Sequence, residues 1–172
     1  NSYNISLNFR WAIHNHSTIN SPNQINLISL PEHNVVRTLQ LNEELLNKVA
    51  KLNLNPIEFI KVNTADGVEL DGWKITPPNF DESKKYPVLF HVYGEPAGQT
   101  VLDRWMRSFF WHQLLALKGY IVISIDNRGT PAPRGRDFRK CVYGQIGILA
   151  SADQADATKV IAEWDYVDKE RI

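Results

Sequence analysis

Apolar residues in the first part of the chain occur in short runs that turn-forming residues separate. Imperfect alternation of polar and apolar positions over such runs is typical of strands. Asn42 is predicted to cap a short helix, because acidic residues follow it and suit the first turn. The pattern predicts three consecutive antiparallel strands before that helix, over residues 5–13, 25–30 and 35–39, with turns at residues 21–23 and 31–34.

From residue 57 onward the apolar runs are longer and more β-rich. Two of them, residues 57–62 and 68–75, flank an Asp-Gly pair, which predicts a hairpin. The runs at residues 88–93 and 120–125 are apolar on nearly every position. Such runs are typical of strands buried on both faces of a parallel sheet.

Two further segments have apolar residues at helical spacing. The first covers residues 105–118, and a glycine follows it. The second is predicted to begin at Ser151, which forms a capping-box pattern with Gln154. Its apolar face is predicted to consist of Ala157, Val160, Ile161, Trp164 and Val167. Strand, helix, strand and helix in this order predict an α/β fold with helices on both faces of the sheet.

Composition narrows the classes of protein that fit. The 172 residues carry 19 Lys and Arg against 19 Asp and Glu, so a basic nucleic-acid-binding domain is not expected. With 43% hydrophobic and 22% charged residues, the chain can bury a core and is not expected to be disordered. One cysteine, Cys141, excludes an intrachain disulfide framework. Neither a membrane-spanning run nor a signal peptide is visible.

No common catalytic or phosphate-binding motif occurs in the chain. The G-x-S-x-G spacing appears once, at residues 94–98, but its centre is Pro96, which has no nucleophilic atom. His14 and His16 lie two apart and could chelate a metal from one strand face, yet no third ligand is evident and a surface pair is the favoured interpretation. We expect His91, inside a predicted strand, and His112, inside a predicted helix, to serve packing or to make a satisfied hydrogen bond.

Candidate site residues follow the two buried strands, because ligand sites of open α/β sheets lie at the carboxyl ends of strands. Tyr93 ends the first strand, and its phenol could donate a hydrogen bond to an oxyanion. On the residues alone, packing is the favoured role. Asp126, Arg128 and Gly129 follow the second strand, where an ion pair and a glycine turn are the favoured interpretation.

Residues 84–96, which read KKYPVLFHVYGEP, resemble the prolyl oligopeptidase family of serine peptidases, and most closely its dipeptidyl peptidase IV branch. Residues 30–39 are similar to the end of that branch's β-propeller. Residues 126–130 are similar to its D-x-R-G-[ST] loop, and Asp153-Gln154 with residues 168–172 to the segment before its nucleophile strand. The resemblance covers residues 24–172 in the right order, and the ordered combination is specific.

This resemblance implies the fold class: the N-terminal half of an α/β-hydrolase domain preceded by the last strands of a β-propeller. It places the propeller end at residues 1–41, a linker helix at 42–56 and the hydrolase part at 57–172. The unfinished sheet leads us to expect that both ends of the chain are cuts and that the Ser, Asp and His of the catalytic triad lie outside it. The chain by itself is therefore expected to be inactive.

The resemblance also implies an activity and a role for Tyr93. The intact protein is expected to be a serine peptidase that releases N-terminal Xaa-Pro or Xaa-Ala dipeptides through an acyl-enzyme, with Tyr93 in the oxyanion hole. Glu95 departs from the family pattern, which has a small residue there, and Glu95 and Arg128 are possible residues of the site edge. Alternatives are a non-catalytic binding protein of the same architecture, and an acylaminoacyl peptidase or esterase.

The expected partners follow from the same resemblance. They are a peptide substrate and a second copy of the protein in a homodimer, with no nucleic acid and no membrane segment in this chain. No cofactor and no metal are expected. Family resemblance favours a periplasmic or secreted location.

Overall fold

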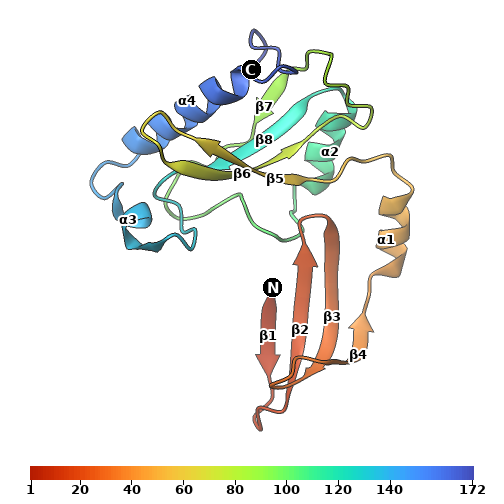
Figure 1. Ribbon diagram of the computed structural model, residues 1–172. Coiled ribbons are helices and arrows are strands. Elements are labelled where there is room, and N and C mark those ends of the chain that lie inside the picture. Colours follow the sequence, from red (N-terminus) through yellow and green to blue (C-terminus); the bar gives the residue numbers. More distant parts are fainter. The chain divides into compact units, whose positions relative to one another are not determined.

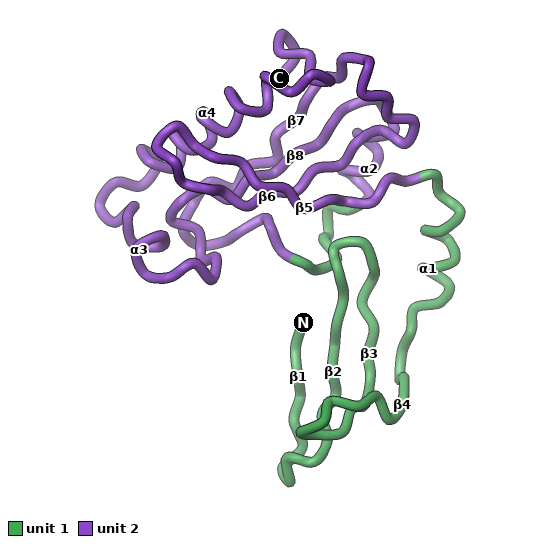
Figure 2. The backbone as a smooth tube through the Cα atoms, in the orientation of Figure 1, with its two compact units in different colours: residues 1–53, 103–109 green, residues 54–102, 110–172 purple.

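The computed structural model describes residues 1–172, which form two compact units (Figures 1 and 2). Unit 1 consists of Asn1–Asn53 and Asp103–Phe109. Unit 2 consists of Leu54–Leu102 and Phe110–Ile172. Each unit has its own sheet, so the two are described separately.

Unit 1 contains an antiparallel four-stranded sheet in which each strand pairs with the next along the chain. Its strands are β1 (Ser2–Ile5), β2 (Trp11–Thr18), β3 (Ser21–Ser29) and β4 (Val35–Gln40). The prediction of one strand over residues 5–13 is wrong, because a turn held by Ser6 separates β1 from β2. The turn predicted at residues 21–23 is also wrong: these residues open β3, and Thr18 pairs with Ser21.

Helix α1 (Glu43–Ala50) follows β4, with the two acidic residues in its first turn as predicted. The capping role predicted for Asn42 is wrong. Asn42 has a left-handed backbone with φ of 57°, and its side chain makes no capping hydrogen bond. The side-chain amide donates instead to the carbonyl of Asn23. A contact with a distant strand therefore takes the place of the local cap.

His14 lies in a group of aromatic side chains in unit 1, not at the surface as expected. The residue is 8% exposed, and its ring stacks on that of Tyr3 with the centroids 4.4 Å apart. His33 lies edge-on to it at 5.0 Å, and His16 lies 5.3 Å away. Burial and the two neighbouring imidazoles lower the pKa of His14. Strand pairing of β1 with β2 brings Tyr3 opposite His14, which a sequence pattern does not reveal.

Unit 2 contains a mixed four-stranded sheet in the order β5-β6-β8-β7. Strands β5 (Glu58–Asn63) and β6 (Glu69–Ile75) form the predicted hairpin. Strand β8 (Ile121–Asp126) is antiparallel to β6 and parallel to β7 (Val88–Phe90). Every residue of β8 is buried, which confirms the prediction of a strand covered on both faces.

Different helices cover the two faces of this sheet. Ile121, Ile123 and Ile125 share a core with Ala157 and Ile161 of α4 (Ile148–Ala162). On the other face of β6, Trp73 packs on His112 of α2 (Phe109–Leu117) with ring centroids 5.1 Å apart. Both faces of the sheet are thus covered, as the sequence pattern predicted.

Two helices begin elsewhere than predicted. Helix α2 begins at Phe109 and not at residue 105. Helix α4 begins at Ile148 after Gly147, whose φ is 90°, so Ser151 lies in the first turn and forms no capping box. The residues of α4 that are buried are Ala150, Asp153, Ala157 and Ile161. The predicted apolar face was therefore wrong at Val160, which is 39% exposed.

Gly72 allows β6 and β8 to lie side by side in the centre of the sheet. A Cβ atom at this position would lie 2.4 Å from Cδ1 of Ile125 and 2.8 Å from the carbonyl oxygen of Ser124. The second neighbour is backbone and cannot rotate away. Any other residue at position 72 would therefore push the two strands apart.

The stability of unit 2 is expected to fall in acid because of His112. Burial, with a smaller contribution from His91, lowers the pKa of His112 from 6.5 to about 4. The unfolded chain therefore binds this proton near pH 6.5, whereas the folded chain binds it only near pH 4. Between these values the unfolded state holds more protons, so the free energy of unfolding falls by as much as about 3 kcal/mol as pH drops from 7 to 4.

Urea unfolding at a series of pH values measures this loss. His112→Gln, which cannot titrate, is expected to show a shallower decrease between pH 7 and pH 4 than the parent protein. Equal slopes for the two proteins would show that another group causes the acid sensitivity.

Candidate active-site edge

Residues 91–101, which follow β7 and are called the Tyr93 loop, are tied to β8 at both ends. At its start, the His91 N–H donates to the carbonyl of Ile123 at 2.7 Å, and the His91 carbonyl accepts from the Ser124 hydroxyl. At its end, Asp126 accepts from the N–H of Thr100 at 2.8 Å and from the N–H of Val101 at 3.1 Å. The loop is therefore fixed by side chains that alternate along one face of β8.

Asp126 is the central residue of this attachment. Its carboxylate is 3% exposed and also accepts from the Thr100 hydroxyl at 2.9 Å. That hydroxyl in turn lies 2.6 Å from the Ser124 hydroxyl. Asp126 was expected to take part in an ion pair with Arg128, and this expectation is wrong: the partners of its carboxylate all lie in the loop after β7.

Tyr93 lies in this loop and not at the end of a strand, because β7 stops at Phe90. The Tyr93 side chain is 48% exposed, and its ring covers Gly98. A Cβ atom on residue 98 would lie 3.2 Å from Cε1 of Tyr93. Gly94 has φ of 78° and turns the chain directly after the tyrosine. The Tyr93 ring thus packs against the backbone at Gly98 and remains half exposed to solvent. Glu95, two residues later, is also exposed.

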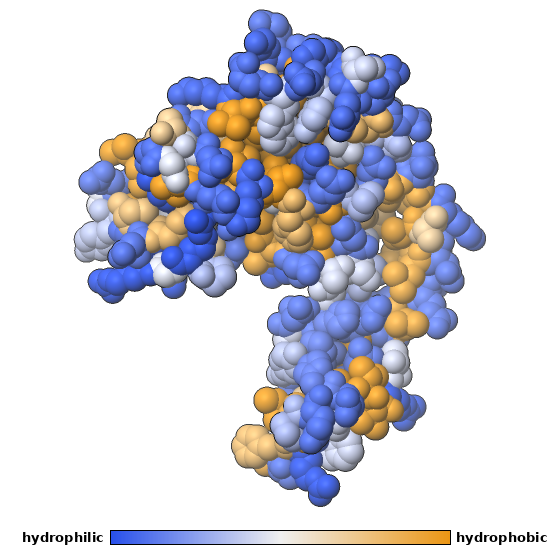
Figure 3. All heavy atoms as spheres, in the orientation of Figure 1, coloured by the Kyte–Doolittle hydropathy of each residue, from blue (hydrophilic) through white to orange (hydrophobic).

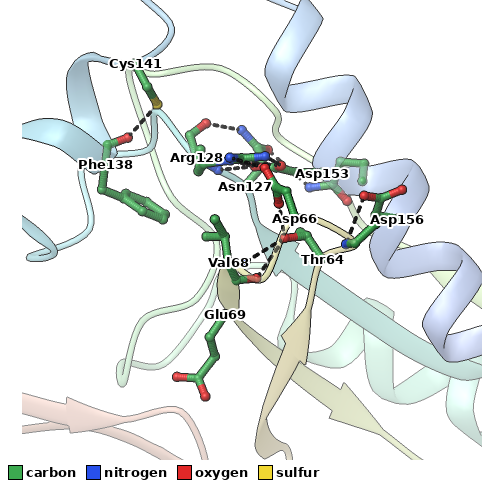
Figure 4. A network of polar contacts seen from close by, with 12 residues as sticks. Thr64, Asp66, Val68, Glu69, Asn127, Arg128, Phe138, Cys141, Asp153 and Asp156 are labelled. Carbon is green, nitrogen blue, oxygen red and sulfur yellow. Dashed lines mark hydrogen bonds and ion pairs between the residues drawn. The ribbon is translucent and has the colours of Figure 1, made fainter.

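Arg128 forms a buried ion pair with Asp153 of α4 (Figure 4). Its Nη2 lies 2.6 Å from Oδ1 of Asp153, and its Nε and backbone N–H donate to the same carboxylate. The third guanidinium nitrogen, Nη1, donates to Asp66 at 2.7 Å. Asp153 is fully buried, whereas the Arg128 side chain is 16% exposed. The hydrogen bonds to Asp153 raise the pKa of Arg128, although burial opposes the rise.

Asp66 lies in the hairpin turn between β5 and β6, so the ion pair joins three segments. Its carboxylate also accepts from the Thr64 hydroxyl at 2.5 Å. The hydrogen bond from Thr64 and then that from Arg128 lower the pKa of Asp66. The N–H of Ala65 donates to Asp156 of α4. Hairpin, helix and the loop after β8 are therefore held together at this end of the sheet (Figure 4).

The loop after β8 is fixed by further hydrogen bonds around Arg128. Gln154 donates to the carbonyl of Ile125 at 2.8 Å and to Asn127 at 3.1 Å. Gly129 has φ of 93°, and a Cβ atom on it would lie 2.6 Å from Val142. The interpretation of Arg128 and Gly129 as an ion pair and a glycine turn agrees with this geometry.

Sequence reasoning missed the partner of Arg128. Asp153 occupies a position where the spacing of Ala150, Ala157 and Ile161 calls for an apolar residue. A single charged residue on the buried face of a helix needs an opposite charge nearby, since burying a lone carboxylate is costly. That break in the helical pattern is the signal that could have found it.

A pocket of about 490 Å³ lies next to the Tyr93 loop in unit 2, and we call it the first hollow. The loop contributes Gln99 and Val101, and β8 contributes Asp126. The other lining residues are Asp71 and Gly72 of β6, residues 59–61 of β5, and Ala132 and Pro133.

Residues 106–172 match the prolyl oligopeptidase family. The probable dipeptidyl-aminopeptidase B of Arthroderma benhamiae is 39% identical over 148 residues, which are 85% of this chain and 16% of that protein. The crystal structure of Porphyromonas gingivalis dipeptidyl peptidase 4 superimposes with a TM-score of 0.93 at 37% identity, over 99% of this chain and 24% of that one. The chain belongs to the prolyl oligopeptidase family.

A second curated relative supports the assignment to the prolyl oligopeptidase family. The probable dipeptidyl peptidase 4 of Emericella nidulans is 37% identical over 149 residues, which are 85% of this chain and 19% of that protein. The dipeptidyl peptidase IV-like resemblance is therefore confirmed, and the mixed α/β structure matches a segment of dipeptidyl peptidase 4. The chain spans less than a fifth of the length of these curated relatives. None of its helices has the length and apolar character needed to cross a membrane.

Proposed function

We propose that the complete protein is a serine peptidase that releases N-terminal Xaa-Pro or Xaa-Ala dipeptides through an acyl-enzyme. The observation that carries this proposal is the position of Tyr93 on a loop fixed to β8, in a chain similar to proteins named dipeptidyl peptidases. In the proposed reaction a serine hydroxyl attacks the carbonyl carbon of the second residue, the C–N bond to the third residue breaks, and the serine proton passes through a base to the leaving amine. Water then hydrolyses the resulting ester and releases the dipeptide.

Tyr93 is proposed to stabilise the oxyanion of this reaction. A phenol hydroxyl is uncharged at pH 7 and still carries its proton, so it can donate a hydrogen bond to the developing negative charge. Such a donor is effective only when its position is fixed in advance. The hydrogen bonds of Asp126 and the packing of Gly98 support this role, because both restrain the loop that carries the phenol.

Residues 1–41 are proposed to be the end of a propeller domain, residues 42–56 a linker helix, and residues 57–172 the N-terminal part of an α/β-hydrolase domain. The strand order of unit 2 and its parallel β7-β8 pair support the last assignment. The outer edge of β7 already contacts the chain after α4, since Tyr86 bridges Val167 in parallel and the Val88 N–H donates to Arg171. A strand after Ile172 could continue this pairing.

The complete reading frame is proposed to contain the nucleophile. We expect G-x-S-x-G within about 10 to 15 residues after Ile172, with the acid and the histidine further on. A frame that lacks this serine would contradict the peptidase proposal and favour a non-catalytic protein of the same architecture.

Chromogenic substrates test the proposed specificity directly. The full-length protein is expected to hydrolyse Xaa-Pro and Xaa-Ala anilides with a free amino terminus, and to hydrolyse their N-acylated forms at least about 100-fold more slowly in kcat/KM, because a site that pairs with a substrate group rejects analogues lacking it. Faster hydrolysis of the N-acylated substrates would instead identify an acylaminoacyl peptidase.

A further inference from the structure

A second hollow in unit 2 carries strong positive charge. It measures about 530 Å³ and is bounded by residues 131–133 and by Gly135, Arg136, Arg139 and Lys140 of α3 (Gly135–Lys140). We call it the basic hollow. No acidic residue lines it. Figure 3 shows hydrophilic residues interspersed with apolar ones over the part of unit 2 that contains α3.

The three cations of the basic hollow have no charged partner, in contrast to Arg134, which precedes them in the chain. Arg134 is engaged by Asp71 at 3.7 Å, by the Glu69 carbonyl and by the Phe138 ring at 4.5 Å. In contrast, Arg136, Arg139 and Lys140 form no ion pair in the structure and are exposed. Unpaired cations around one concave surface focus a positive potential that attracts anions.

The basic hollow adjoins the first hollow, beside the Tyr93 loop. Both are lined by Ala132 and Pro133. The first hollow reaches Gln99, Val101 and Asp126, the residues at the end of that loop and on the strand that holds it. A peptide lying along this surface would thus pass from the neighbourhood of Tyr93 to the three cations.

We propose that the basic hollow binds acidic side chains of the peptide substrate on the C-terminal side of the cleaved bond, an inference that rests on the proposed function. On the N-terminal side the substrate has only two residues, which extend at most about 7 Å. Only the C-terminal side is long enough to continue beyond the first hollow. Carboxylates suit the cations because Arg and Lys form charge-assisted hydrogen bonds with them. The protein would therefore prefer peptides whose residues after the cleaved bond include Asp or Glu.

The test compares two substrates that share an Xaa-Pro start and differ in a tail of four residues, either Asp and Glu or Ser and Gln. The ratio of kcat/KM for the acidic over the neutral tail is expected to fall about 5- to 10-fold in Arg139→Gln/Lys140→Gln. The matched control Lys85→Gln/Lys118→Gln removes two exposed cations of unit 2 that lie outside the hollow, and its ratio is expected to stay unchanged. The rate on an Xaa-Pro anilide is expected to be the same in all three proteins.

Fluorescence anisotropy of a labelled acidic tail peptide separates the failure of this inference from that of the proposed function. If Arg139→Gln/Lys140→Gln binds the acidic peptide more weakly and the control variant does not, the basic hollow is supported as a binding site. This holds even if the protein hydrolyses nothing and the proposed function is wrong. Hydrolysis with an unchanged ratio and equal peptide binding by the variant and its control would overturn the inference and leave the proposed function standing.

Discussion

Asp153→Asn is expected to lower the free energy of unfolding by about 3 kcal/mol, because removing one partner of a buried ion pair leaves the other without compensation. The substitution keeps the shape of the side chain but removes its charge. In the parent protein, Arg128 donates three hydrogen bonds from its side chain and one from its backbone N–H to the Asp153 carboxylate. The substitution places the NH₂ group of an amide, itself a donor, against these donors. Asp66, which is largely exposed, can compensate only in part. Urea unfolding followed by circular dichroism measures the change.

Asp156→Asn is the matched control on the same helix. Its carboxylate pairs with the exposed Lys159 and accepts a hydrogen bond from the Ala65 N–H, which the amide oxygen of asparagine can still accept. A much smaller loss than in Asp153→Asn is therefore expected. Equal losses in the two variants would show that the Arg128 pair does not hold the hairpin, the loop and α4 together. Replacing both partners at once, as Arg128→Met/Asp153→Leu, is expected to restore part of the stability, because no unpaired charge remains.

Tyr93→Phe is expected to lower the kcat of the proposed full-length peptidase by at least about 100-fold, the effect of removing one donor from the proposed oxyanion hole. Phenylalanine keeps the ring that covers Gly98, so the loop is expected to hold its shape. KM on an Xaa-Pro anilide is expected to change little, since the lost interaction forms mainly in the transition state.

Tyr120→Phe provides the control for this prediction. Tyr120 is 38% exposed, directly before β8, and lies outside the proposed site. The Tyr120→Phe substitution also removes one hydroxyl, but kcat is expected to stay unchanged. If Tyr93→Phe also left kcat unchanged, the Tyr93 hydroxyl would have no part in the reaction and the residue would serve packing.

Predictions from the sequence succeeded where local pattern and burial agree. The β5-β6 hairpin follows from an Asp-Gly pair between β-rich runs, and β8 from its unbroken apolar run. They failed where a distant contact decides the conformation. Asn42 binds the carbonyl of residue 23, and the loop after β7 bends away from the strand to meet Asp126.

The candidate site was only partly visible in the sequence. Tyr93 was a packing residue on local grounds, and only the resemblance to a family gave it a chemical role. The attachment of its loop depends on Asp126 and Thr100, which are 26 positions apart, and no spacing rule joins them. The Arg128-Asp153 pair spans 25 positions and is equally invisible to local patterns, apart from the polar break in α4.

The attachment of the Tyr93 loop to β8 relies largely on the loop's backbone. The His91 carbonyl and the N–H groups of Thr100 and Val101 bind side chains of the strand, and every residue except proline supplies both groups. Residues 95–97 can therefore vary during evolution without moving the phenol.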